Sequence, residues 1–399
     1  MTPSCLAPDS ALTFSKRVAQ IHVSATKEMP VLASRVGNCV SLGQGVPSFS
    51  APVHIIDSVC RMLRENPSAS KYSLQAGMTE LRHHISETLL REKKIQVDPD
   101  KEVLVTVGAM EGLMAAILTV VDRGDEVILP SPTYASHIEQ VLLAEGTPVF
   151  VPLRATDWGL EVDQIRNAVT EKTRAIILCN PGNPTGAVFD DADVLALCEL
   201  AVEEGIIIIS DETYDFMTYG IPMPVSPASL PRFRKQVISV FSFSKKYALT
   251  GWRVGYITAC EQLMAQIMKA HDASAICAPT PSQYAALAAL SGPQTCVKEM
   301  CRALTARKKL CCRRLDQMAG IFDYVEPRGA FYVMARYLFT DRPSRDVAIQ
   351  ILNEAGVITI PGGSFGPQGE GHLRISFGGE EEELNEAFDR MEKWAGSIV

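Results

Sequence analysis

Short apolar runs alternate with helical patterns in the middle of the chain. Each run has four or five residues and is rich in β-branched side chains, as expected for strands that are buried on both faces. The runs lie at 103–107, 126–129, 148–152, 175–179, 206–210, 237–241 and 254–258. Between them, apolar residues recur at helical spacing, as in the stripe Met110, Leu113, Met114, Ile117, Val120 and Val121. The alternation predicts an α/β fold, with a mostly parallel seven-stranded sheet between helices.

The last two runs are separated by too few residues for a full crossover helix. A parallel pair of strands needs such a crossover, whereas an antiparallel pair does not. We therefore expect one strand of this sheet to run antiparallel to the others.

Both ends of the chain have a different pattern. Residues 1–50 carry little strand signal, and after 290 helical stretches alternate with short strand-like pieces. The helical stretches are 297–320, 343–355 and 380–395, and the strand-like pieces are 330–333 and 373–377. We expect a large α/β domain at 51–294 and a smaller α+β domain built from 1–50 and 295–399.

Composition and charge exclude several classes of protein. The chain has 38 Lys and Arg against 46 Asp and Glu, a net charge of −8, which argues against general nucleic-acid binding. No apolar stretch approaches the roughly 18 residues of a membrane span, and the start lacks the pattern of a secretory signal. The 11 cysteines include no C-x-x-C and no metal-type spacing with histidine. We expect a cytoplasmic protein without a membrane partner or a bound metal, with reduced thiols.

Polar and reactive residues follow the predicted strands. In open parallel sheets, ligands bind beyond the carboxyl ends of the strands. The segments found there are 108–110 (GAM), 131–134 (SPTY), 180–183 (NPGN), 211–214 (DETY) and 242–246 (SFSKK). Hydroxyls, an aromatic ring, an acid and a lysine at one edge indicate an anionic, aromatic cofactor attached through an amine.

Several of these segments resemble one known family. They are 180–186 (NPGNPTG), 211–214 (DETY), 242–255 (SFSKKYALTGWRVG), 41–47 (SLGQGVP) and Arg374. They follow one another along nearly the whole chain in the family's order, and they are similar to the class I/II pyridoxal-phosphate aminotransferases of fold type I, the aspartate aminotransferase fold. The resemblance implies a transaminase that uses pyridoxal 5'-phosphate. It would move the amino group of an L-amino acid to a 2-oxo acid such as 2-oxoglutarate by a ping-pong mechanism.

Two adjacent lysines are candidates for the covalent role. In the family this lysine lies eight residues before an arginine, and counting back from Arg253 selects Lys245 over Lys246. A lysine amine can form a Schiff base with the cofactor aldehyde and, once displaced by substrate, act as a general base. The catalytic residues implied are Lys245, Asp211 and Tyr214.

The cofactor ring is assigned by the same resemblance. Asp211 would pair with the pyridine nitrogen, Asn183 and Tyr214 would contact the ring 3-oxygen, and Tyr134 would stack on the ring. Each has a structural alternative: Asp211 could cap a helix, Asn183 could form a turn and Tyr134 could be a core tyrosine.

The phosphate requires hydrogen-bond donors and positive charge. The expected groups are the backbone amides of Gly108, Ala109 and Met110, the hydroxyls of Ser242 and Ser244, and the guanidinium of Arg253. Tyr72 resembles the tyrosine that family members contribute to the neighbouring subunit's phosphate. That role implies a homodimer with shared active sites, although Tyr72 could also be ordinary core packing.

The substrate would be held by a second arginine. Arg374 matches the residue that binds the α-carboxylate, helped by Asn183 and the backbone of Gly45, and Phe365 is expected to line the pocket or pack in the core.

The residue that would recognise a distal substrate group is left open. A subset of relatives carries a lysine where this chain has Met110, so the donor remains aspartate, an aromatic or another neutral amino acid. His137 and Arg17 are candidates for a distal carboxylate.

Two other interpretations use the same scaffold. The first is a carbon–sulfur β-lyase or a γ-elimination enzyme, whose reaction begins with the same proton abstraction. The second is a non-catalytic regulator behind a DNA-binding domain, which would need an additional basic N-terminal unit.

Overall fold

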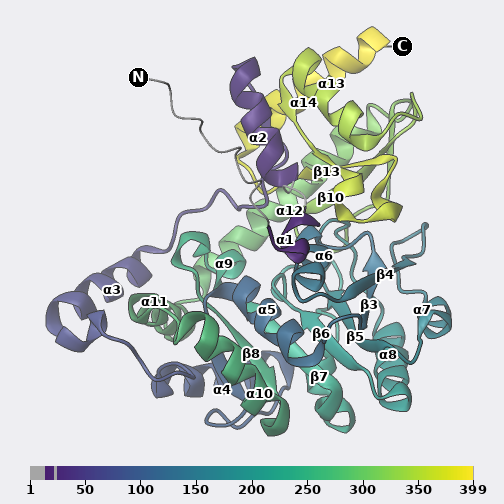
Figure 1. Ribbon diagram of the computed structural model, residues 1–399. Helices are drawn as coiled ribbons and strands as arrows, with labels where there is room; N and C mark the ends of the chain where they lie inside the picture. The colour runs from purple at the N-terminus through teal and green to yellow at the C-terminus, as the bar shows by residue number, and fades with distance from the viewer. Residues whose placement is uncertain (1–13, 22–24, 399) are drawn as a thin grey trace, which may run out of the picture.

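A seven-stranded sheet forms the centre of the larger of two regions (Figure 1). The computed structural model describes residues 14–21 and 25–398. The strands are β2 (Val103–Thr106), β3 (Glu126–Ser131), β4 (Thr147–Pro152), β5 (Thr173–Cys179), β6 (Ile207–Asp211), β7 (Val237–Ser242) and β8 (Gly255–Ala259). Their order is β2-β8-β7-β6-β5-β3-β4. Strand β8 pairs antiparallel with β2 and β7, and the other six are parallel, which confirms the predicted fold class.

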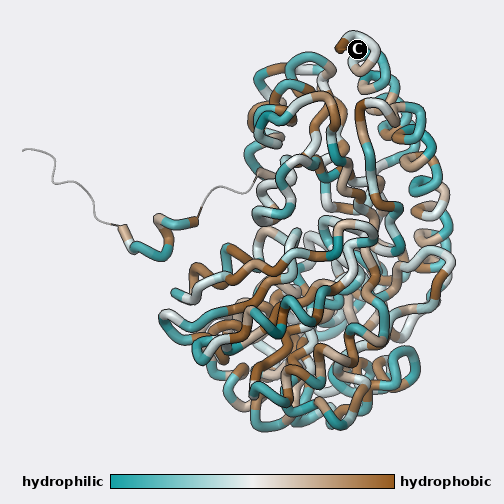
Figure 2. Tube along the Cα trace, turned by 90° about the vertical axis from the view of Figure 1, so that its right-hand side faces the viewer, coloured by the Kyte–Doolittle hydropathy of each residue, from teal (hydrophilic) through white to brown (hydrophobic). Residues whose placement is uncertain are grey.

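Both faces of this sheet are covered by helices. They are α3 (Val53–Glu65), α4 (Thr79–Lys93), α5 (Gly108–Val120), α6 (Ala135–Leu143), α7 (Val162–Ala168), α8 (Asp191–Glu204), α9 (Phe243–Lys246), α10 (Glu261–Ala275) and α11 (Thr280–Ser291). Ile176 and Leu178 of β5 belong to one buried cluster, whereas Ala175 and Ile177 belong to another. Side chains alternate between the faces of a strand, so a continuous apolar run fills both layers. Figure 2 shows hydrophobic segments concentrated inside this region.

The smaller region combines both ends of the chain (Figure 1). Its elements are α2 (Ala25–Val36), β1 (Val40–Ser41), α12 (Thr295–Asp316), β9 (Phe322–Tyr324), β10 (Tyr332–Tyr337), α13 (Ser344–Ala355), β11 (Val357–Ile358), β12 (Ile360–Pro361), β13 (His372–Ser376) and α14 (Glu381–Ile398). An antiparallel sheet has the order β12-β13-β10-β9, and β1 pairs with β11. One buried cluster joins Met29 of α2 to Phe388 of α14. The domain boundaries at 50–51 and 294–295 remain a prediction.

The remaining helical segments are short. They comprise α1 (Lys16–Ala19) and the 3₁₀ turns Pro67–Ser70, Pro227–Ser229, Pro231–Gln236, Thr250–Trp252, Gly362–Phe365 and Pro367–Gly369. Within residues 14–21 and 25–398, no helix has the length and apolar character needed to cross a membrane.

Candidate active site

A cavity of about 490 Å³ opens at the carboxyl ends of the parallel strands, beside the smaller region. Its wall includes residues from the loop 43–46, the start of α5, the ends of β5, β6 and β7, and strands β10 and β13. Twelve of the predicted site residues line it: Gly45, Ala109, Met110, Tyr134, Asn183, Asp211, Tyr214, Ser242, Ser244, Lys245, Arg253 and Arg374. The parallel topology brings together groups that lie far apart in the sequence.

Three predicted residues lie outside the cavity wall. Gly108 lies beside Arg253, since a Cβ atom at Gly108 would be 2.7 Å from Arg253 Nη2. Phe365 does not line the cavity, because its fully buried ring packs 5.1 Å from the guanidinium carbon of Arg374. Tyr72 is 80% exposed and is not core packing in this chain.

The two candidates for a distal carboxylate do not reach the cavity. His137 is fully buried on α6, behind Asp211, and Arg17 of α1 lies 4.0 Å from Glu145 in an ion pair. The suggestion that either one binds a substrate carboxylate inside this protomer's cavity is therefore wrong.

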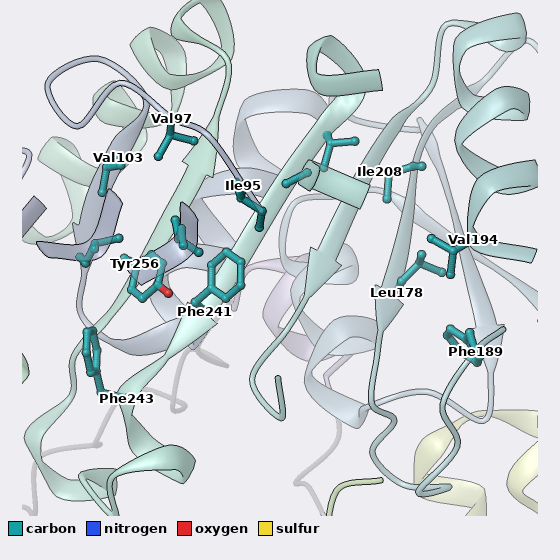
Figure 3. Packing of buried hydrophobic residues seen from close by; sticks show 14 of the residues in the cluster. Ile95, Val97, Val103, Leu178, Phe189, Val194, Ile208, Phe241, Phe243 and Tyr256 are labelled. Atoms are coloured by element: carbon teal, nitrogen blue, oxygen red, sulfur yellow. The ribbon is translucent and has the colours of Figure 1, made fainter. Parts of the chain in front are cut away.

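The turn between β7 and α9 presents the two candidate lysines. Ser242 caps this turn, because its Oγ accepts a hydrogen bond from the Ser244 amide at 3.1 Å. The ring of Phe243 is buried 5.6 Å from that of Tyr256, which stacks on Phe241 at 4.8 Å (Figure 3). The packing of these three rings holds in place the backbone that carries the two lysines.

The amines of the two lysines lie in different surroundings. Lys245 lines the cavity, and its Nζ donates to the carbonyl oxygen of Gly45 at 2.5 Å. Lys246 lies on the side of the turn away from the cavity, where its Nζ donates a hydrogen bond to Glu92 Oε2 at 2.8 Å.

These surroundings move the two pKa values in opposite directions. Burial, together with the positive charges of Arg374 and Arg253, lowers the pKa of Lys245 to about 8. Burial also acts to lower the pKa of Lys246, but Asp215, Tyr247 and Glu92 outweigh it and raise that pKa. The amine of Lys245 is therefore the one that is readily available in its neutral, nucleophilic form.

Asp211 emerges from β6 with only 4% of its surface exposed. Its Oδ2 lies 3.2 Å from His137 Nε2, and its Oδ1 accepts from the Thr213 amide at 3.1 Å. His137 is itself held by Thr133, whose Oγ1 lies 3.1 Å from Nδ1. A buried carboxylate with both oxygens bonded is held in one orientation, and its charge suits a cationic or protonated partner in the cavity.

Arg374 is a buried cation on β13 without an acidic partner among residues 14–21 and 25–398. Its Nη1 donates to Asn183 Oδ1 at 3.2 Å and its Nη2 to the Gly43 carbonyl at 2.6 Å, while its buried Nε lacks any partner in the described chain. Burial lowers its pKa, which means that the charged form is not fully compensated. An unpaired guanidinium that lines a cavity suits a carboxylate ligand.

A second anion site is formed where α5 begins. Arg253 donates from Nη1 to the Thr250 carbonyl at 2.9 Å and has no ion pair within the described parts of the chain. The hydroxyl residues Ser242 and Ser244 line the same cavity, and Gly108 leaves space beside the guanidinium that a Cβ atom would fill. A helix N-terminus, two hydroxyl residues and a free guanidinium fit a phosphate group.

Two tyrosine hydroxyls meet beside these groups. Tyr214 Oη and Tyr332 Oη lie 2.9 Å apart, and burial followed by the proximity of Tyr332 raises the pKa of Tyr214 far above its usual value. The sequence analysis missed Tyr332, which lies on β10 of the smaller sheet and lines the cavity. The sequence pattern at 330–333 predicts a strand, but it contains nothing that indicates an active-site residue.

Comparison with known proteins identifies the family. A family model described as aminotransferase class I and II matches residues 37–391. An aspartate aminotransferase of Pyrococcus abyssi is 36% identical over 385 residues, which cover 96% of this chain and 98% of the relative. An aromatic-amino-acid aminotransferase of Thermococcus litoralis is 35% identical, with the same coverage. The solved structure of Thermus thermophilus aspartate aminotransferase with maleate has a TM-score of 0.90 and 30% identity, covering 97% of this chain and 100% of that one.

The chain belongs to the aminotransferase class I and II family. It is a transaminase, which exchanges an amino group between an amino acid and a 2-oxo acid. The names of these relatives do not favour the carbon–sulfur lyase as an alternative.

Proposed function

We propose that this transaminase uses pyridoxal 5'-phosphate to move the amino group of an L-amino acid with an uncharged side chain to a 2-oxo acid. The observation that carries the proposal is the pair of arginines without acidic partners around one lysine. Arg253 belongs to the large region and Arg374 to the small sheet, and the positive charge of each lowers the pKa of Lys245. Such a cavity would bind two anions, the cofactor phosphate at Arg253 and the substrate α-carboxylate at Arg374, with Lys245 between them.

The residues present fit the cofactor. Its phosphate would be held by Arg253, Ser242, Ser244 and the amides at 108–110, and its aldehyde carbon by the Lys245 amine. When bound, pyridoxal phosphate supplies the electron-poor ring that takes up the charge left at the substrate α-carbon.

Three further side chains would hold and tune the ring. Asp211, oriented by His137, would keep a proton on the ring nitrogen, and Tyr134 would cover the ring face. Asn183 offers its side-chain nitrogen to the ring oxygen, because its Oδ1 already accepts from Arg374.

Lys245 and Arg374 would act on the substrate. Arg374 binds the α-carboxylate in a fixed orientation, which places the α-proton near the Lys245 amine. The Lys245 amine that the incoming substrate frees would lie in position to accept this proton. Lys245 would then pass this proton on to the bound cofactor, and the second substrate would reverse these transfers in a ping-pong sequence.

The cavity wall favours an uncharged donor side chain. Among the described residues that line it, the cations are Lys245, Arg253 and Arg374, and each already has a role. Pro30, Val46 and Met110 supply apolar surface. A distal carboxylate would be desolvated here without a cation from the same chain, which costs free energy.

Mixing the purified holoprotein with one amino acid at a time tests this function. Half-transamination converts the aldehyde form of the cofactor into its amine form, with a fall of the long-wavelength absorbance band and a rise at shorter wavelength. We expect phenylalanine, tyrosine or leucine to react at least about tenfold faster than aspartate, the discrimination that a poorly solvated charge produces. A faster reaction with aspartate would overturn the donor class, and no reaction with any amino acid would overturn the function.

We also propose that two copies share their active sites. Tyr72 and Leu74 are 80% and 62% exposed, and Tyr72 is absent from the cavity of its own chain. In a homodimer Tyr72 would contact the phosphate in the partner's site. Mixing inactive Lys245→Ala protein with a weakly active Tyr72→Ala protein should restore activity, because a hybrid dimer then has one intact site. If subunit exchange is demonstrated and activity stays low, the sites are not shared.

A further inference from the structure

Tyr332 contacts two residues that have separate roles in the proposed function, Tyr214 and Arg374. Its side chain is 1% exposed, and its hydroxyl lies 2.9 Å from that of Tyr214. The face of its ring lies 4.7 Å from the guanidinium carbon of Arg374. The same hydroxyl is 3.5 Å from the carbonyl oxygen of Gly45, which accepts from Lys245. One side chain therefore contacts both the ring-oxygen side and the carboxylate side of the cavity.

We propose that Tyr332 is a positioning residue. Its hydroxyl orients the Tyr214 hydroxyl toward the cofactor ring oxygen, and its ring face supports the guanidinium of Arg374. Tyr214 faces a ring oxygen only if the proposed function holds, so this role rests on that function.

Proton counting fixes the direction of the hydrogen bond. Each phenol has a single proton to donate. Burial raises the pKa of Tyr332 to about 12 and raises that of Tyr214 well above its usual value, so both hydroxyls remain protonated near neutral pH. If Tyr214 donates its proton to the ring oxygen, then Tyr332 must donate to Tyr214. The alternative acceptor, Gly45, is at the outer limit of a hydrogen bond and already accepts from Lys245.

The chain leaves space for this hydroxyl. A Cβ atom at Gly45 would lie 2.8 Å from Tyr332 Oη, which is closer than real Cβ contacts. The lack of a side chain at Gly45 thus permits the approach that brings Tyr332 within reach of Tyr214.

The ring and the hydroxyl of Tyr332 have separable consequences. A hydrogen bond donated to Tyr214 strengthens Tyr214 as a donor, which stabilises negative charge on the ring oxygen. Losing it should raise the pH at which the lysine–cofactor linkage loses its proton. The ring face, by contrast, supports the Arg374 guanidinium through a cation–π contact, which matters for carboxylate binding.

Three variants separate these effects in the holoenzyme. Absorbance of the bound cofactor is titrated with pH, and donor affinity is measured with a non-reacting monocarboxylate such as hydrocinnamate. Tyr332→Phe should raise the titration midpoint by about 0.5 to 1 unit, the size of one neutral hydrogen bond, with carboxylate affinity within about twofold of wild type. Tyr332→Leu should show that shift and, in addition, bind the carboxylate about 5- to 30-fold more weakly.

Tyr219→Phe is the matched control. Tyr219 donates to the Ala330 carbonyl at 2.6 Å and does not line the cavity, so both measurements should match wild type. An unchanged midpoint in Tyr332→Phe, or an equal shift in Tyr219→Phe, would overturn the role of Tyr332. A wild-type protein with no cofactor absorbance after supplementation would instead overturn the proposed function, and this role with it.

Discussion

The two sides of the turn after β7 show how counter-charges separate a reactive lysine from a structural one. On the cavity side, burial followed by the charges of Arg374 and Arg253 lowers the pKa of Lys245 to about 8, and Asp211 opposes this only in part. On the opposite side, Lys246 has Glu92 and Asp215 as neighbours, and its pKa rises. Both amines are largely buried, so burial alone does not distinguish them. The sign of the surrounding charge does.

The side that carries Lys246 is an ion-pair network. Lys93 Nζ lies 3.3 Å from Glu212 and 3.4 Å from Asp215, and Glu212 also accepts from Ser226 Oγ at 2.5 Å. Every buried charge there has an opposite charge nearby. On the cavity side, neither Arg253 nor Arg374 forms an ion pair with any residue that the structure describes. The side of the turn whose arginines have no acidic partner is therefore the side that is open to ligands.

Replacing Lys245 should have the largest effect. Lys245→Ala removes both the covalent attachment and the base, so turnover should fall by about 10³-fold or more, and the absorbance of the linked cofactor should disappear. Lys246→Ala is the neighbouring control and should retain both. Steady-state kinetics and an absorbance spectrum measure these outcomes.

Borohydride trapping identifies the attached residue directly. Reduction of the holoenzyme and peptide mapping should place the cofactor on Lys245. A label on Lys246 would show that the register inferred from Arg253 is wrong.

Breaking the ion-pair network at Lys93 should have the next largest effect, on stability. Lys93→Met removes the cation that pairs directly with the buried carboxylates of Glu212 and Asp215, which should lower the free energy of unfolding by about 3 kcal/mol. Lys94→Met, at an exposed neighbour, should change it by less than about 0.5 kcal/mol. Urea unfolding at neutral pH compares them, and equal values for both variants would contradict a role for the network.

The pH dependence of this stabilisation has a definite sign. Burial opposes the charge of Lys93, but Asp215 and Glu212 outweigh it and raise its pKa above the usual 10.5. A raised pKa means that the contribution is complete below 10.5 and is lost only as the pH rises through the folded-state value. The difference between wild type and Lys93→Met should therefore be constant from pH 6 to 9.

The lowered pKa of Lys245 predicts a moderate kinetic effect. The rate at which pyridoxal phosphate attaches to the apoprotein should rise with pH around a midpoint of about 8, because only the neutral amine attacks the aldehyde. Arg374→Leu removes one of the two positive charges and should move the midpoint upward by about 0.5 to 1 unit. A midpoint that stays in place would show that burial alone lowers the pKa.

Much of the fold and the site could be predicted because local patterns determine them. The apolar runs are continuous since both faces of each strand are buried, and a parallel sheet gathers its carboxyl ends at one edge. Asn183, Asp211 and Lys245 could thus be grouped without knowing any distance.

The contacts that tune the site could not be predicted in this way. His137 reaches Asp211 across 74 residues, and Tyr332 reaches Tyr214 from a different sheet. Phe365 packs against Arg374 from a 3₁₀ turn. These partners depend on how whole elements pack, and no spacing in the sequence encodes that.

Removing the Lys246 amine should have the smallest effect on stability. The pH dependence of that effect tests whether the acidic surroundings of Lys246 differ from the surroundings of Lys245 as described. Lys246→Met keeps the packed stem but removes one of the two cations paired with Glu92, the other being Arg91. Because Glu92 is about one-third exposed, solvent limits the loss to about 1 kcal/mol at pH 7. Burial raises the pKa of Glu92, yet Lys246 and Arg91 lower it below its usual 4.5 overall. A lowered carboxylate pKa contributes stability above pH 4.5 that is lost as the pH falls through the folded-state value. The difference in unfolding free energy between wild type and Lys246→Met should therefore shrink as the pH falls below 4.5. A difference that persists unchanged would mean that packing against Tyr247, rather than the ion pair, accounts for the contribution of Lys246.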